Sequence, residues 1–200
     1  MQYGRGGDNI PAVFHLVAIA ASAGGLPALA AILEHLPRAF PLPIAIVQHL
    51  DPNHVSLMPH ILGRRSALTV KHAAHGDIIT RGMVYIAPPA HHLQIADNGC
   101  VALTQDDPVR FLRPCADTLF ASAARVLGPI IGVILSGTGS DGAAGAEAIR
   151  GAGGHVIAQD EATSAFFGMP QAAIRRGAVD RVLSLLDIAP ALEALTGAHA

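Results

Sequence analysis

Residues 16–36 read LVAIAASAGGLPALAAILEHL, and this stretch decides the fold. Its first five residues are a short, continuous apolar run, which is typical of a strand buried on both faces of a parallel sheet. A helix is predicted from Gly25 to Leu36, where Pro37 ends it. Its apolar residues share one helical face: Leu26, Leu29, Ala30, Leu33 and Leu36. Because a second apolar run, IAIVQ at 44–48, follows, the sequence predicts a strand–helix–strand unit.

The same alternation returns in the second half of the chain. Apolar runs at 130–135 (IIGVIL) and 155–159 (HVIAQ) predict strands. Helices are predicted at 115–127, with Leu119, Ala123 and Val126 facing inward, at 143–150, near 170–176, and from a cap at Asp187 to about Thr196. Alternating strands and helices predict an α/β fold with a doubly wound, mostly parallel sheet flanked by helices.

The middle of the chain has a different pattern. Runs at 83–87 (MVYIA), 93–96 and 100–104 are separated by short connections, and a tight Asp97-Asn98-Gly99 turn lies before the last of them. Such turn residues between apolar runs are typical of hairpins. We therefore expect antiparallel pairing in this region.

Length and composition limit the domain organisation. A chain of 200 residues fits one domain, and 51% hydrophobic against 14% charged residues excludes an intrinsically disordered protein. Residues 1–11 (MQYGRGGDNIP) carry three glycines and no periodicity, so we expect a flexible leader there and a single domain over 12–200.

Charge and cysteine content exclude several functional classes. Thirteen Lys and Arg against fifteen Asp and Glu give a net charge of -2, which argues against nucleic acid as a partner. Cys100 and Cys115 form no CxxC pair, so a reduced, cytoplasmic setting is expected. The apolar stretch 12–21 is shorter than the ~18 residues of a membrane span, so no membrane insertion is expected. Its ending, AIAASA, resembles a signal-peptide cleavage site, but the following SAGG favours a strand that leads into a helix.

Three loops at predicted carboxyl ends of strands carry reactive side chains, and ligands bind at this edge of parallel sheets. Ser22 stands in a glycine-rich turn, His49 follows the second strand, and Asp141 lies in SGTGSDG at 136–142. Taken singly, Ser22 and Asp141 are ordinary helix caps and His49 is an ordinary strand-end histidine. Together they predict a nucleophile, a base and an orienting carboxylate, with backbone N–H groups of the serine turn available to an oxyanion.

A nucleotide-binding module is the alternative. Gly137-x-Gly139-x-x-Gly142 stands between a predicted strand and a helix, as in the Rossmann dinucleotide fingerprint, and Asp160 lies eighteen residues beyond Gly142. Asp141 argues against this hypothesis, because its negative charge would lie beside a pyrophosphate.

The eleven histidines raise a third hypothesis, a metal site. The candidate sets are His49 with Asp51 and His54, His72 with His75, and His91 with His92. None has a recognised ligand spacing, so no metal and no cofactor are expected.

Five blocks, in order, carry a family resemblance: VAIAASAGGLPAL, IVQHLDPNH, FLRPCADTLFASAA, VILSGTGSDGAAGAEAI and FGMPQAAI. From about Leu16 to Leu186 the chain resembles the catalytic domain of the CheB-type chemotaxis receptor methylesterases. The resemblance implies a Ser22, His49, Asp141 triad on a largely parallel, doubly wound sheet. It also implies hydrolysis of glutamate methyl esters on methyl-accepting chemotaxis receptors, with glutamine deamidation as a related activity.

The resemblance further implies residues around the reaction centre. Backbone N–H groups at Ala23, Gly24 and Thr138 are expected to hold the oxyanion, although many members have methionine where this sequence has Thr138. Segments 110–114 and 168–170 resemble the substrate rim, with Arg113 and Met169 as the candidate contacts. Arg113 has the alternative of being an ordinary surface arginine near a helix start.

Besides Thr138, the sequence departs from the family pattern in a second respect, which concerns regulation. Most members have an N-terminal phospho-receiver domain that covers the active-site face, whereas about eleven residues precede the domain in the sequence given. We therefore expect no receiver domain in it and activity without phosphorylation. A receptor methyltransferase or a receiver-domain protein acting in trans would be its further partners.

Overall fold

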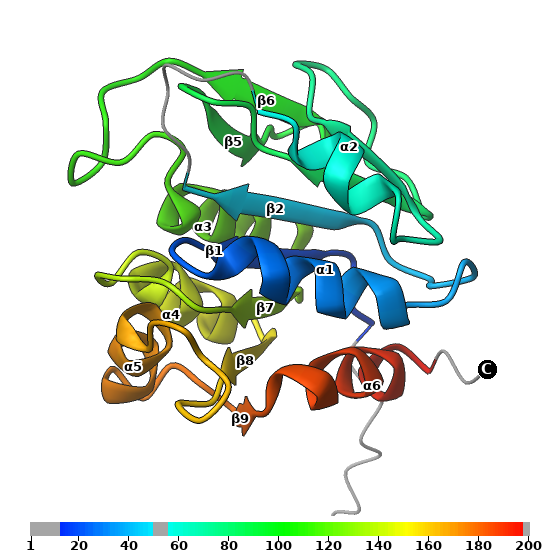
Figure 1. The fold of residues 1–200 in the computed structure, drawn as a ribbon. Helices are drawn as coiled ribbons and strands as arrows, with labels where there is room; N and C mark the ends of the chain where they lie inside the picture. Colours follow the sequence, from blue (N-terminus) through cyan, green and yellow to red (C-terminus); the bar gives the residue numbers. More distant parts are fainter. Residues whose placement is uncertain (1–12, 50–55, 198–200) are drawn as a thin grey trace, which may run out of the picture.

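The computed structural model describes residues 13–49 and 56–197. Its main sheet has seven parallel strands in the order β3-β4-β2-β1-β7-β8-β9 (Figure 1). The strands are β1 (Val17–Ala21), β2 (Ile44–Gln48), β3 (Thr69–His72), β4 (Met83–Ile86), β7 (Ile131–Ile134), β8 (His155–Gln159) and β9 (Arg181–Leu183). The predicted parallel, doubly wound sheet is confirmed.

Helices cover both faces of this sheet (Figure 1). They are α1 (Gly25–His35), α2 (Met58–Gly63), α3 (Ala116–Leu127), α4 (Ala143–Gly151), α5 (Gly168–Arg175) and α6 (Leu185–Thr196). The alternating side chains of β1 explain the two layers: Val17 and Ile19 pack with α1, α2 and α6, whereas Ala18 and Ala20 pack with α3, α4 and α5. Burial on both faces is the reason that the central strands are continuous apolar runs.

The antiparallel part of the fold is smaller than predicted. Among the strands of the described residues, only β5 (His92–Ile95) and β6 (Val101–Thr104) pair antiparallel, and they lie beside α3. The run 83–87, expected in the same hairpin region, instead supplies β4, which pairs parallel with both β2 and β3. Val84 and Ile86 are fully buried, as expected for an interior strand. The short connection from this run to the next one suggested a hairpin instead.

Some elements differ from the sequence prediction at their ends or were not predicted. Ser184 stands at the N-cap of α6, and Asp187 lies inside the first turn, where it accepts a hydrogen bond from Ser184 Oγ at 2.6 Å. The edge strands β3 and β9 and the six-residue α2 were not predicted, because their sequences lack a long apolar run. The predicted leader, 1–11, lies outside the described residues.

The connections that follow β1 and β7 leave in opposite directions across the sheet. From β1 the chain passes to β2 and then to β3 and β4 on one side of β1, whereas from β7 it passes to β8 and β9 on the other side. Neighbouring strands with diverging connections open a crevice at their carboxyl ends, which is the usual ligand site of such sheets. Ser22 follows β1 and the SGTGSDG loop follows β7, so both border this crevice.

Candidate active site

Ser22 occupies a tight turn between β1 and α1. The Gly25 N–H donates to the Ser22 carbonyl at 2.8 Å and closes the turn, while Gly24 adopts a positive φ of 75°. A Cβ at Gly24 would lie 2.6 Å from Ala165 Cβ and 2.7 Å from Ser136 Oγ. Glycine is therefore needed at this position both for its conformation and for space.

The Gln48 side chain holds the serine and histidine backbones together. Its Nε2 donates to the Ser22 carbonyl at 2.8 Å and to the His49 carbonyl at 3.0 Å. Sheet register aligns the same pair, because Ala21 and Gln48 are partners and the His49 N–H donates to the Ala21 carbonyl at 3.0 Å. Gln48 was not predicted as a site residue, although its place beside His49 at the strand end was the signal available.

His49 and Asp141 form the central pair of the site. His49 Nε2 lies 2.7 Å from Asp141 Oδ2, and only 13% of the histidine side chain and 3% of the aspartate side chain are exposed. A carboxylate at Nε2 places the ring proton there, which leaves Nδ1 as the nitrogen that can accept a proton. The structure thus places the Asp141 carboxylate, predicted to orient the histidine, beside the His49 ring.

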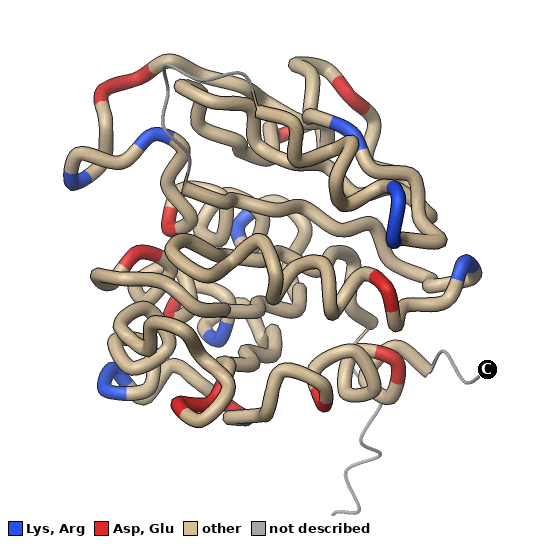
Figure 2. Tube along the Cα trace, viewed as in Figure 1, with Lys and Arg blue, Asp and Glu red and all other residues tan. Residues whose placement is uncertain are grey.

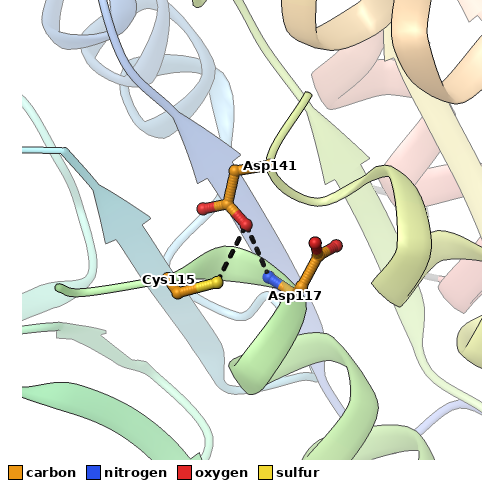
Figure 3. A group of neighbouring side chains, drawn as sticks. All are labelled: Cys115, Asp117 and Asp141. Carbon is orange, nitrogen blue, oxygen red and sulfur yellow. Dashed lines mark hydrogen bonds between the residues drawn. The ribbon is translucent and has the colours of Figure 1, made fainter. Parts of the chain in front are cut away.

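Asp141 accepts further hydrogen bonds from the start of α3 (Figure 3). The Ala116 N–H donates to Oδ2 at 2.6 Å, and the Asp117 N–H and the Cys115 thiol donate to Oδ1, each at 3.0 Å. Burial alone would raise the pKa of Asp141, but the hydrogen bonds from His49, Ala116, Asp117 and Cys115 lower it to about 2. Asp141 is thus an ionised carboxylate held at a helix N-terminus.

Cys115 lies beside this carboxylate as a thiol and not as a thiolate. Its burial, the charge of Asp141 and the hydrogen bond to that residue raise the Cys115 pKa to about 12. The ligand atoms of Cys115, Asp117 and Asp141 lie within 4.8 Å of one another. Figure 3 shows what holds the three residues together, which is hydrogen bonds from the Cys115 thiol and the Asp117 N–H to Asp141. The sequence signal for this network was the CAD segment at 115–117, because it stands at the start of a predicted helix, where free N–H groups attract a carboxylate.

Ser22 and His49 share one cleft with Asp141. The cleft encloses about 360 Å³, and Arg110, Leu112, Cys115 and Thr138 are among its other lining residues. Within the described ranges no hydrogen bond joins Ser22 Oγ to His49. Bonds between a nucleophile and its base are often long in unliganded enzymes and shorten when the substrate binds.

Two loops at this crevice carry backbone N–H groups that are free to bind a ligand. Those of Ala23, Gly24 and Thr138 donate to no protein acceptor in the ranges 13–49 and 56–197. The first two precede α1, whose N-terminus carries a partial positive charge. Thr138 lines the cleft itself. The arrangement can bind an oxyanion, which is the role predicted for these three residues.

The two predicted rim residues have different surroundings. Arg113 donates from Nη1 to the carbonyls of Gln105 at 2.9 Å and Asp106 at 3.1 Å, so its guanidinium fastens the loop that precedes α3. Met169 is fully buried, and its sulfur packs against Gly137. The Met169 side chain therefore supports the SGTGSDG loop from the core and has no surface to offer a substrate.

The glycines of the nucleotide-binding alternative have structural roles. A Cβ at Gly137 would contact Met169 Sδ and lie 2.8 Å from Ser22 Cβ, and Gly142 with φ 89° is the N-cap of α4. Asp160 accepts hydrogen bonds from Thr163 in its own loop. Nothing in this arrangement supports nucleotide binding.

The histidines considered for metal binding are spread over separate contacts. His72 Nε2 lies 3.2 Å from the Ser56 carbonyl, His75 Nδ1 accepts from the Leu103 N–H, and His91 Nδ1 lies 2.9 Å from the Pro89 carbonyl. Asp51 and His54 lie outside the described residues.

An α/β fold that brings a serine, a histidine and a buried aspartate into one cleft has the arrangement of a serine hydrolase. Residues 17–192 match the family model described as CheB methylesterase, and the chain belongs to this family.

Two curated relatives and one solved structure define the similarity. The chain is 48% identical, over 90% of its length and 53% of the relative's, to protein-glutamate methylesterase/protein-glutamine glutaminase 2 of Anaeromyxobacter dehalogenans. It is 45% identical, over 91% and 55%, to the protein-glutamate methylesterase FrzG of Myxococcus xanthus. The crystal structure of the Thermotoga maritima CheB methylesterase catalytic domain superposes with a TM-score of 0.87 at 39% identity, covering 92% of this chain and all of that one.

The chain spans about half the length of the curated relatives it matches. Among the helices in the described ranges, none is long and apolar enough to cross a lipid bilayer.

Proposed function

We propose that this protein is a protein-glutamate methylesterase, which removes methyl esters from glutamate side chains of methyl-accepting chemotaxis receptors. The observation that carries the proposal is the hydrogen bond between His49 and buried Asp141 in the cleft that Ser22 lines. The names of the relatives give the substrate class.

In the proposed reaction Ser22 Oγ attacks the ester carbonyl carbon while His49 Nδ1 takes the hydroxyl proton. Asp141 keeps the other ring proton on Nε2 and stabilises the imidazolium. When the tetrahedral intermediate collapses, the bond from carbon to the methoxy oxygen breaks, His49 returns its proton, and methanol leaves. Water then attacks the acyl-enzyme with His49 again as base, which releases the glutamate and restores Ser22.

The oxyanion of each tetrahedral intermediate would be held by the N–H groups of the Ser22 turn and of Thr138. Donors that are already aligned cost no reorganisation during the reaction, and each is worth ~3 to 4 kcal/mol of barrier. Threonine in place of methionine at 138 is compatible with this role, because the donor is the backbone.

Deamidation of glutamine is proposed as a second activity of the same site. The first of the two relatives above carries protein-glutamine glutaminase in its name. An amide would form the same acyl-enzyme and release ammonia in place of methanol. A cytoplasmic location follows from substrates of this kind, and a methyltransferase or a receiver-domain protein acting in trans is proposed as a further partner.

The test is methanol release from a methylated receptor fragment. Ser22→Ala should abolish it, whereas Ser66→Ala should release methanol at the rate of the unmodified protein, because Ser66 lies outside the cleft and accepts a hydrogen bond from Leu68. Equal rates for Ser22→Ala and the unmodified protein would refute the proposal.

A further inference from the structure

A two-residue hairpin turn lies in the loop between β6 and α3, at the rim of the cleft. The Val109 N–H donates to the Leu112 carbonyl at 3.1 Å, and the Leu112 N–H donates to the Val109 carbonyl at 2.9 Å. Arg110 and Phe111 are the two central residues, with φ values of 49° and 68°. Two positive φ values in a two-residue turn are the type I′ pattern, for which Asn-Gly is the usual sequence.

Arg-Phe is a poor sequence for this backbone. Residues with a Cβ are disfavoured in the left-handed region, and a bulky aromatic residue is disfavoured most. Packing gives no compensation, because the Phe111 side chain is fully exposed and belongs to neither core cluster. Side chains kept at an unfavourable position without a structural benefit point to a role outside the fold.

Arg110 lines the same cleft as Ser22 and His49. Its Nη1 lies 3.4 Å from Ser140 Oγ, and no carboxylate of the described residues lies within 4.0 Å of its guanidinium. The nearby carboxylates have other partners, because Asp141 binds His49 and Asp117 accepts from the Gly145 N–H at 2.7 Å. Arg110 is thus a cation at the cleft that forms no ion pair with the described residues, although its charge acts on Asp117 from a longer distance.

Arg113, in the same loop, is not available to a substrate in this way, because the Arg113 guanidinium donates hydrogen bonds to carbonyls of its own loop. Figure 2 shows the basic residues of this loop at the edge of the molecule where the strands β1 and β2 end. A polypeptide that presents an ester to Ser22 would therefore pass this turn.

We infer that Arg110 is a specificity residue: it binds a carboxylate side chain of the polypeptide substrate close to the esterified glutamate, while Phe111 contacts an apolar side chain of the same polypeptide. The inference rests on the proposed function and names the class of its substrate, a segment rich in acidic residues. Arginine suits this role because its planar guanidinium can bind a carboxylate with two parallel hydrogen bonds.

The test uses two synthetic peptides with one glutamate γ-methyl ester each. The residues flanking the ester are glutamates in one peptide and glutamines in the other. For the unmodified protein we expect kcat/KM to favour the acidic peptide, through KM. Arg110→Gln should lower the ratio of the two kcat/KM values about tenfold, which is the cost of losing a charge-assisted contact.

Two further variants separate recognition from folding. Arg38→Gln is the matched control, since it removes the same charge from an exposed arginine beyond the far end of α1, and the ratio should stay unchanged. The double variant Arg110→Asn with Phe111→Gly restores the preferred turn sequence, so it should melt at a higher temperature than the unmodified protein and yet lose the preference for the acidic peptide.

Binding to Ser22→Ala measures recognition apart from hydrolysis. The acidic peptide should bind this variant about tenfold more tightly than it binds Ser22→Ala with Arg110→Gln. If the unmodified protein hydrolyses neither peptide but this difference in binding appears, the proposed esterase reaction is wrong and the proposed binding of an acidic segment by Arg110 is supported. Equal kcat/KM ratios with and without Arg110, or equal binding by the two Ser22→Ala proteins, would overturn the inference.

Discussion

His49 Nε2 lies 2.7 Å from Asp141 Oδ2, and this distance links the stability of the fold to its chemistry. The same carboxylate receives three hydrogen bonds from the start of α3. Asp141 therefore joins the loop after β7 to the N-terminus of α3 and to His49, which follows β2. A change at Asp141 should affect both unfolding and catalysis.

The stability of the protein should fall in acid because of Asp141. Its pKa in the folded protein, about 2, lies below the ordinary value of 3.8, so the ionised carboxylate stabilises the fold above about pH 4. That contribution is lost as the pH falls through about 2, and it amounts to about 2 kcal/mol. Urea unfolding between these pH values should show a loss of this size that is missing in Asp141→Asn. Parallel pH profiles for the two proteins would contradict the assignment.

Replacing Asp141 by Asn should also slow ester hydrolysis, by roughly 10⁴-fold, because an amide cannot hold the imidazolium or fix the ring proton on Nε2. The measurement is kcat for methanol release. A loss below about tenfold would mean that Asp141 has only a structural role.

Gln48→Ala should reduce kcat more than it raises KM. The variant loses both hydrogen bonds that fix the Ser22 and His49 carbonyls, so the nucleophile and base are less well aligned. A cost of about 1 to 3 kcal/mol in unfolding free energy is expected as well. An unchanged kcat in a destabilised Gln48→Ala would limit the role of this side chain to stability.

Gly24→Ala and Gly76→Ala form a matched pair. Both glycines have positive φ, 75° and 84°, but a Cβ at Gly24 would collide with Ala165 and Ser136, whereas a Cβ at Gly76 would meet no atom within 4 Å. Gly76→Ala should cost about 1 to 2 kcal/mol of stability with full activity, and Gly24→Ala should cost more and inactivate the enzyme. Similar results for the two variants would show that the space around Gly24 has no importance.

The two cysteines should differ in reactivity. Cys115 is buried with a pKa raised to about 12, so it should react with a thiol reagent only after unfolding, whereas Cys100 is half-buried and should react in the native protein. Counting the thiols that react with and without urea tests this. Rapid labelling of Cys115 in the native state would contradict its hydrogen bond to Asp141.

The sequence predicts the central strands, the long helices and the three loops of the site, because buried parallel strands are uniform apolar runs and the site residues follow them directly. The edge strand β3 could not be found in this way, since Thr69 and Lys71 break the apolar pattern of a strand that is only partly buried. Gln48 and Cys115 escaped prediction for another reason. Their positions gave a local signal, but their roles depend on contacts between segments far apart in the chain, such as the thiol of Cys115 with Asp141, and a local signal does not identify the partner.

Covalent trapping at Ser22 tests the central claim most directly. The unmodified protein, mixed rapidly with an activated acetyl ester and quenched in acid, should carry one acetyl group, and peptide mass spectrometry should locate it on Ser22. His49→Gln should slow this acylation strongly in a protein that is still folded at the assay temperature, with a lower melting temperature because Asp141 loses its hydrogen bond from His49. Acetylation of a different residue at the same rate in Ser22→Ala, or continued methanol release by that variant, would contradict Ser22 as the nucleophile.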